Sequence, residues 1–384
     1  MGQAKSGIVW QPLSHFLKET RNWGPVEISA SLAVLDIPWI VKPLYGLVSD
    51  FLPILGSRRR SYLVLASFGT AAGYAFVASA ASSAAIIPAL VITAVALAMA
   101  STVCGALLVE NGQRLDASAA FVNQQWLWFN AAAIAASLAG GWLTGTLSSE
   151  GALRAAACIA AVASLAVLAV TRLVYEQPAA IDRAGFTRAL HGLRASTKNQ
   201  DLWIIAIFLF CYYFSPGFGT PLYFTLTDGL GFSQPFIGAL SAVTALGWIA
   251  GGLFYRFALY RLPRRDLLML SLIAGAGSTL AYLGLAGPIS AMLIYFMGGV
   301  AAMIANIATL SLAATVCPKG AEGFTFAAMM SVINLAQPLS DTLGSLLYEH
   351  VFDRQLGPLI VVSAGFTAFV LFLVPFMGVA RRVG

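Results

Sequence analysis

The stretch GLVSDFLPILGSRRRSYLVL, residues 46–65, decides the fold class of this chain. It ends one long apolar run, turns through a proline, a glycine and three consecutive arginines, and begins a second apolar run. Apolar runs of about 20 residues are long enough to cross a lipid bilayer as helices, and short loops rich in arginine are typical of the cytoplasmic side. The stretch therefore predicts two membrane-spanning helices joined by a cytoplasmic loop.

The rest of the chain repeats this pattern. Of the 384 residues, 59% are hydrophobic and 10% are charged, whereas a soluble domain has about 25% charged residues. This composition excludes an ordinary soluble enzyme, a disordered chain and a nucleic-acid-binding module, although the net charge is +6. We predict eleven spanning helices, at about residues 26–49, 61–81, 86–109, 119–147, 152–174, 201–225, 234–257, 266–286, 289–315, 323–350 and 357–380.

A shorter run at about residues 7–18 precedes these spans and is too short and too polar to cross a membrane alone. We expect it to belong to a twelfth helix whose beginning is shortened, and no signal peptide is visible. The one long polar stretch, residues 175–200, falls between the sixth and seventh helices. The sequence therefore predicts an all-α membrane protein with two six-helix bundles, residues 1–174 and 201–384, joined by a cytoplasmic linker over residues 175–200.

Basic residues gather in every alternate loop, which predicts that these loops and both termini face the cytoplasm. The alanine-rich composition and the lack of a visible presequence favour a bacterial inner membrane. We also expect the protein to be a monomer surrounded by the lipid bilayer.

Polar side chains within the predicted spans identify candidate site residues, because such groups are costly at membrane depth and usually face a protein interior or a water-filled path. Asp36 lies near the middle of the second helix, and Lys42 follows six residues later. Asp36 has one of two roles. It either binds substrate or carries a proton, or it is neutralised by a partner and only stabilises the packing of the helices. Lys42 either binds an anionic group of the substrate or forms a structural ion pair.

The remaining candidates are one further carboxylate and several amides. Asn334, Gln337 and Asp341 have the spacing i, i+3, i+7, which places them on one face of a helix. The full set of candidates for substrate binding or proton coupling is Asp36, Lys42, Asn123, Asn130, Asn306, Asn334, Gln337 and Asp341. Glu110 and Glu322 lie at the predicted cytoplasmic edge, where carboxylates pair with loop arginines more often than they bind substrate.

The same search finds no pattern typical of an enzyme. The sequence has no HExxH, GxSxG, GxxxxGK[ST] or CxxC motif, and its three histidines are not spaced as a pair of metal ligands. Its four cysteines have no paired spacing. We therefore predict no catalytic residues, no metal site and no cofactor.

Three strings of this sequence resemble those of a known family: PLSHFLKE at 12–19, PWIVKPLYGLVSDFLPILGSRRRSYL at 38–63 and CPKGAEGFTFAAMMSVINLAQPLSDTLG at 317–344. The chain is similar to the folate–biopterin transporters of the major facilitator superfamily. The resemblance implies a secondary active transporter that moves folate- or pterin-type solutes by alternating access, in symport with protons.

The resemblance also implies roles for particular residues. Asp50, Arg59 and Arg60 would form a cytoplasmic latch that steadies one conformation, with Glu110 and Glu322 at the same edge. A carboxylate could bind the N–H groups of a pterin ring in bidentate fashion, and Asp36 is the first candidate for this contact and Asp341 the second. Lys42 could meet a carboxylate of a folate.

Two alternatives to a folate or pterin transporter remain open. One is a transporter of the same fold for another small solute, such as an amino acid, a sugar or a drug. The other is a non-transporting receptor or scaffold. Buried Asp36 and Asp341 argue against the second alternative, because a scaffold gains little from costly carboxylates in the membrane.

Overall fold

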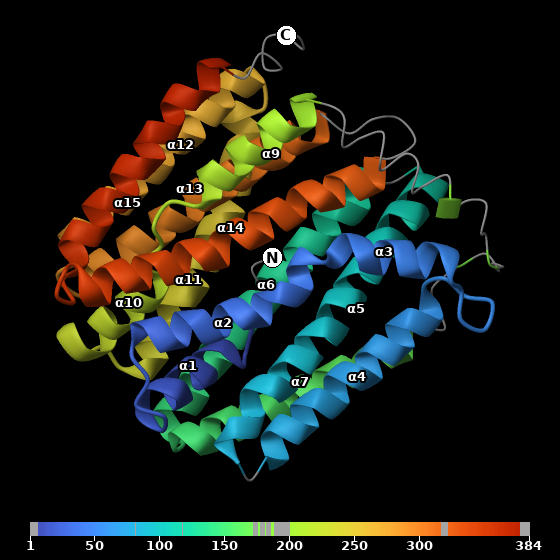
Figure 1. The fold of residues 1–384 in the computed structure, drawn as a ribbon, viewed down its shortest axis with the longest axis horizontal. Helices are drawn as coiled ribbons and strands as arrows, with labels where there is room; N and C mark the ends of the chain where they lie inside the picture. The colour runs from blue at the N-terminus through green and yellow to red at the C-terminus, as the bar shows by residue number, and fades with distance from the viewer. Residues whose placement is uncertain are drawn as a thin grey trace.

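The computed structural model describes residues 7–80, 82–116, 118–171, 176, 181, 186–187, 200–315 and 322–376. Within these residues the chain is almost entirely helical, and the only β-type pairing is an isolated bridge between Ile54 and Ser57. The helices lie side by side along one common direction (Figure 1). The predicted all-α class is confirmed.

The helices of the first half of the chain are α1 (Trp10–Glu19), α2 (Pro25–Ile40), α3 (Lys42–Phe51), α4 (Arg60–Ser79), α5 (Ile86–Arg114), α6 (Ser118–Thr146) and α7 (Ser149–Thr171). Those of the second half are α9 (Gln200–Tyr213), α10 (Gly219–Phe224), α11 (Gln234–Phe254), α12 (Arg264–Leu280), α13 (Pro288–Thr315), α14 (Glu322–His350) and α15 (Leu356–Val370). Two π-helical turns, Thr225–Gly229 and Tyr255–Leu259, extend α10 and α11.

Every predicted span contains a helix, and the short run at residues 7–18 corresponds to α1, which has 10 residues. In the described part of the chain, nine helical segments are long enough and apolar enough to cross a membrane. The 29-residue helix α14 is not among them. Its polar residues, Asn334, Gln337 and Asp341 among them, lower its hydropathy, as expected for a helix that faces the protein interior.

Two of the predicted spans are interrupted. The span at 26–49 changes direction at Val41, between Pro38 and Pro43, because neither proline has a backbone N–H to continue the helical hydrogen bonds. The span at 201–225 is broken at residues 214–218, which separate α9 from α10. Irregular backbone at membrane depth is tolerated where protein or a water-filled cavity surrounds it.

Helices α1–α7 and helices α9–α15 occupy opposite sides of the molecule (Figure 1). The two sets meet chiefly where α6 packs on α11 and where α2 and α3 pack on α14. At the first contact a Cβ on Gly141 would lie 2.9 Å from the Cα of Gly238, so the small residues let these helices approach closely. The bundle boundaries at 174 and 201 stay predictions, since most of the linker over 175–200 lies outside the described residues.

Candidate functional site

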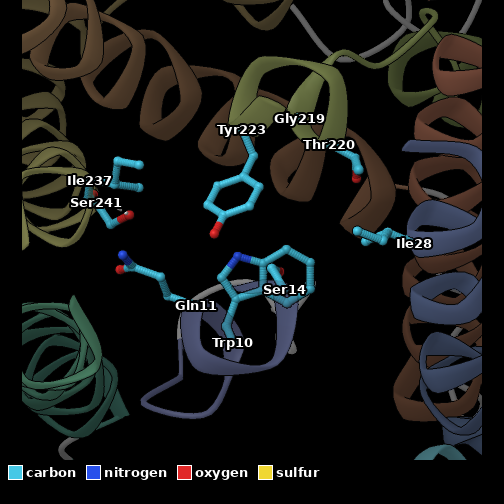
Figure 2. A pocket seen from close by; sticks show the side chains of 9 residues that line it. All are labelled: Trp10, Gln11, Ser14, Ile28, Gly219, Thr220, Tyr223, Ile237 and Ser241. Carbon is cyan, nitrogen blue, oxygen red and sulfur yellow. Dashed lines mark hydrogen bonds between the residues drawn. The ribbon is translucent and has the colours of Figure 1, made fainter. Parts of the chain in front are cut away.

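A small cavity lies between the two sets of helices, where α1, α10 and α11 meet and α2 closes one side (Figure 2). Its volume is about 60 Å³. The residues that line it are Trp10, Gln11, Ser14, Ile28, Gly219, Thr220, Tyr223, Ile237 and Ser241. We call it the central cavity, because helices from both halves of the chain form its walls.

A hydrogen-bond network ties the walls of the central cavity together. Gln11 Nε2 donates to the carbonyl oxygen of Gln234 (2.7 Å) and to its side-chain Oε1 (2.9 Å). The hydroxyl of Tyr223 donates to the same Oε1 (3.3 Å), and Figure 2 shows this hydroxyl pointing toward the indole of Trp10. Aromatic rings beside amide groups suit a planar solute with hydrogen-bonding edges, since the rings can stack while the amides bind the edge.

Ser14 supplies a polar group that protein contacts do not satisfy. The residue is 4% exposed, and its Oγ has no hydrogen-bond partner among the described residues. A buried hydroxyl without a partner costs about 1–3 kcal/mol. A ligand or a water molecule in the cavity would relieve this cost.

A second cavity of about 280 Å³ lies on the other side of Trp10, among α1, α2, α4, α5 and α7. Trp39 and Tyr74 contribute aromatic surface to its lining. Lys42 lies close by, because its Nζ is 4.7 Å from the ring centroid of Trp39 and donates to Ser101 Oγ (3.0 Å). A cavity lined by aromatic rings with an ammonium group nearby is suited to an aromatic solute that carries an anionic group, since the rings can stack and the ammonium can pair with the anion.

Three predicted site residues, Asp36 on α2 and Asn334 and Asp341 on α14, lie next to residues that line these cavities, although none of the three belongs to a lining. Asp36 is buried, with 8% of its surface exposed. Asn334 Nδ2 donates to the backbone oxygen of Trp39 (3.0 Å), which links α14 to α2. Asp341 accepts hydrogen bonds from the N–H of Gly219 (3.1 Å) and the hydroxyl of Thr220 (2.9 Å), directly behind the wall of the central cavity.

The other predicted site residues lie elsewhere. Asn130 is buried and donates to the backbone oxygen of Trp126 within α6 (2.8 Å). Asn306 on α13 and Gln337 on α14 are half-buried and belong to the lining of neither cavity. Asn123 lies on α6, but its side chain is outside the described part of the structure.

At the end of the molecule that carries the basic loop, Arg59 forms a buried ion-pair cluster. The residue is 7% exposed, and its Nη2 lies 2.5 Å from Asp50 Oδ1 and 2.7 Å from Glu110 Oε1. Burial lowers the pKa of Arg59, but the two carboxylates outweigh this effect and hold its pKa above the usual value. The structure thus brings together three of the five predicted latch residues.

The remaining two latch residues are placed differently. The guanidinium of Arg60 has no carboxylate within ion-pair distance among the described residues. The side chain of Glu322 lies outside the described part of the chain. The latch function itself stays a prediction.

The contrast between two neighbouring arginines gives a testable prediction. We expect Arg59→Gln to lower the free energy of unfolding by about 2 kcal/mol, less than a fully buried pair would lose because Asp50 and Glu110 are partly exposed. Arg60→Gln should cost less than about 1 kcal/mol, because Arg60 is half-buried and its guanidinium has no carboxylate partner among the described residues. Thermal unfolding of the detergent-purified variants measures both, and equal losses would contradict the arrangement.

Glu176, which no sequence pattern indicated, fixes the backbone of the same arginine loop. Its carboxylate accepts hydrogen bonds from the N–H groups of Arg58 (2.5 Å), Arg59 (2.7 Å) and Arg60 (3.0 Å) and from Ser57 Oγ (2.7 Å). Burial raises the pKa of Glu176, but these hydrogen bonds outweigh it and lower the pKa below the usual value.

The lowered pKa predicts how pH affects stability. A carboxylate whose pKa is lower in the folded state stabilises the fold above its unfolded pKa, and this contribution is lost as the pH falls through the folded pKa. Glu176→Gln should therefore be less stable than wild type at neutral pH, and the difference should shrink below a pH of about 4.5. The melting temperatures of wild type and Glu176→Gln, measured across a range of pH, test this prediction. Glu150→Gln is the control, because Glu150 is an exposed carboxylate that pairs with Arg154. A pH-independent difference would be the contrary result.

The α1 side of the central cavity comes from the structure, since the sequence predicts residues 7–18 only as part of a shortened helix. A signal was nevertheless present, because Gln11, Ser14 and Lys18 share the spacing i, i+3, i+7 that identified Asn334 and Asp341 on α14.

Comparison with known proteins supports the fold and identifies the family. The sequence pattern of the BT1 family matches residues 2–377. The chain is 30% identical to a folate-biopterin transporter of Synechocystis sp., over 98% of this chain and 79% of the relative. It is 26% identical to "Probable folate-biopterin transporter 2" of Arabidopsis thaliana, over 87% and 70% of the two chains.

Among solved structures, the crystal structure of a D-xylose–proton symporter matches with a TM-score of 0.71, although the sequences are only 14% identical. The match covers 98% of this chain and 93% of the symporter, which confirms the predicted major-facilitator type of fold. The chain therefore belongs to the BT1 family, with folate–biopterin transporters among its relatives, and is a multi-pass membrane transporter rather than an enzyme.

Proposed function

We propose that this protein is a secondary active transporter that moves folate- or pterin-type solutes by alternating access, coupled to protons. The names of its relatives support the solute class, since the similarity extends over nearly the whole chain. The observation that carries the proposal is the central cavity, where Trp10 and Tyr223 lie near the amides of Gln11 and Gln234. This chemistry fits a flat ring with several hydrogen-bonding groups.

The charged residues around the two cavities have separate tasks in this proposal. Asp36 and Asp341 bind the N–H groups of the pterin ring or carry the coupling proton. Lys42 binds a carboxylate of the glutamate portion of a folate, because its Nζ lies 4.7 Å from the ring of Trp39, which lines the second cavity. The amides Asn123, Asn130, Asn306, Asn334 and Gln337 complete the set of proposed polar contacts along the path.

Alternating access requires contacts between the halves that form and break. Lys18 of α1 forms an ion pair with Asp228 and donates to Thr227 Oγ1 (2.6 Å), both in the π-helical turn after α10. At the same end the N–H of Val26 donates to Glu349 of α14 (3.3 Å). In our proposal these contacts close the end of the molecule opposite the arginine loop, and the cluster of Arg59, Asp50 and Glu110 steadies the other end.

The proposal also includes a setting for the protein. The basic loops, including Arg58–Arg60, face the cytoplasm, because alternate loops carry the lysines and arginines. The protein works as a monomer in a bacterial inner membrane. Two bundles, residues 1–174 and 201–384, move against each other about the linker over 175–200, as in transporters built from two similar halves.

Uptake into proteoliposomes tests this function. We expect the wild-type protein to accumulate radiolabelled folate and biopterin when the external solution is more acidic, and a protonophore should abolish the accumulation. Lys42→Gln should reduce folate uptake about tenfold or more, since a hydrogen bond to a charged group is worth about 1.5–3 kcal/mol. Uptake of uncharged biopterin should change little. Transport of neither compound by the wild type would overturn the proposed function.

A further inference from the structure

The break between α9 and α10 is held by the helix α14. Gly217 in the break donates its N–H to the carbonyl oxygen of Ser340 (2.9 Å). The hydroxyl of Ser340 donates in return to the carbonyl oxygen of Ser215. A Cβ on Gly344 would lie 1.6 Å from the oxygen of Gly217. Two polar groups of the irregular backbone, the N–H of Gly217 and the carbonyl of Ser215, are thus paired with α14, which lies in direct contact with the break.

Asp341 of α14 also binds the beginning of α10. Its Oδ1 accepts the N–H of Gly219 and its Oδ2 accepts the hydroxyl of Thr220, and the residue is 5% exposed. The first N–H groups of a helix have no partner within the helix. A side chain of α14 therefore satisfies a backbone group that α10 cannot satisfy itself.

The short segment that Asp341 holds has two further sets of contacts. Thr220 and Tyr223 form a wall of the central cavity (Figure 2). The π-helical turn that follows carries Thr227 and Asp228, which bind Lys18 of α1. One short element therefore joins α14, the central cavity and the contact between the halves.

We propose that Asp341 is a positioning residue, which holds α10 against α14 and thereby sets the width of the central cavity between α10 and α1. When both hydrogen bonds to Asp341 are lost, α10 and the side chain of Tyr223 are no longer held in one position, so the cavity wall loosens and reagents reach Ser14 more readily. The inference rests on the proposed function only in taking the central cavity as part of the transport path. The positioning role depends on hydrogen-bond geometry and not on charge, and it is separate from the pterin contact or proton transfer proposed for Asp341 above.

Two substitutions separate geometry from charge. Leucine has the shape of aspartate but no acceptor atoms, so Asp341→Leu removes both hydrogen bonds. Asparagine keeps one oxygen for the N–H of Gly219, and the hydroxyl of Thr220 can reverse to accept from the amide. Asp341→Asn therefore loses the charge but keeps both hydrogen bonds to α10. Thr220→Val removes one of the two bonds and tests the same point if the leucine variant does not fold.

The test measures the labelling of Ser14→Cys by a small, membrane-impermeant methanethiosulfonate, in protein whose four native cysteines are replaced by serine. Ser67→Cys is the matched control, since Ser67 is also 4% exposed but belongs to α4, a helix that packs on α5 and α7 and contributes no residue to the central cavity. Asp341→Leu should speed labelling at residue 14 about threefold or more, with a smaller increase for Thr220→Val. Asp341→Asn should label like wild type, and residue 67 should not change in any variant.

Three results would overturn the inference. Labelling at residue 14 could stay unchanged in Asp341→Leu and Thr220→Val, or rise as much in Asp341→Asn as in Asp341→Leu, or rise equally at residue 67. Labelling is independent of any solute. If the wild type carries neither folate nor biopterin while labelling at residue 14 behaves as expected, the proposed function fails and the positioning role of Asp341 stands.

Discussion

Replacing Gly344 by alanine is expected to destabilise the protein by about 3 kcal/mol or more, the upper range for adding a methyl group to a packed interior. The added Cβ would lie 1.6 Å from the carbonyl oxygen of Gly217 and 2.6 Å from its carbonyl carbon. Both are backbone atoms, so no side chain can rotate away. The break cannot shift freely either, because the N–H of Gly217 is bonded to Ser340.

Gly277→Ala is the matched control for this prediction. Gly277 lies within α12, and a Cβ there would have no atom within 4 Å. Alanine should be neutral or stabilising there by up to about 1 kcal/mol, from helix propensity alone. Size-exclusion profiles and melting temperatures of the purified variants measure the difference. If Gly344→Ala has the same melting temperature as wild type, α14 and the break between α9 and α10 are not packed as described.

Asp36→Asn is expected to reduce folate and pterin uptake by about tenfold to a hundredfold, since a charge-assisted hydrogen bond is worth about 1.5–3 kcal/mol. Asp36 is buried in α2, and carboxylates inside membrane helices are costly and commonly mark functional sites. Exchange of labelled for unlabelled solute separates its two proposed tasks. Loss of a proton carrier spares exchange, whereas loss of a substrate contact abolishes exchange and uptake together.

Glu27→Gln provides the comparison on the same helix, because Glu27 is exposed and lies in the first turn of α2. Its uptake should match that of the wild type. Normal uptake by Asp36→Asn would remove Asp36 from the proposed site, while the assignment to the family would be unaffected.

The membrane spans could be predicted from the sequence because hydropathy and helical period are local properties. The interruption after Tyr213, found in the structure within the predicted span at 201–225, also has a local cause, since Ser215, Pro216 and Gly217 disfavour a continuous helix. The polar face of α14 is also visible in the sequence and makes Asp341 a candidate, but its position behind the wall of the central cavity comes from the structure. In each case the information lies within one helix.

The rest of the site depends on contacts between distant segments. Gln11 and Gln234 are 223 positions apart in the chain, and only packing of α1 on α11 makes them partners. Glu176 binds backbone N–H groups, which every residue except proline carries and which no sequence pattern distinguishes. Three consecutive arginines look equivalent in the sequence, and the turn of the loop decides that Arg59 is the one held between Asp50 and Glu110.

Ligand-induced thermal stabilisation of the purified protein tests the central claim most directly. The panel contains folates, pterins, amino acids, sugars and nucleosides, each measured at a pH of about 5.5 and about 7.5. A ligand present at 100 times its dissociation constant stabilises the folded state by about 2.7 kcal/mol. We predict that folates or pterins alone raise the melting temperature, that the shift depends on pH, and that Asp36→Asn abolishes it. Stabilisation by another class of solute, with none by folates or pterins, would contradict the account.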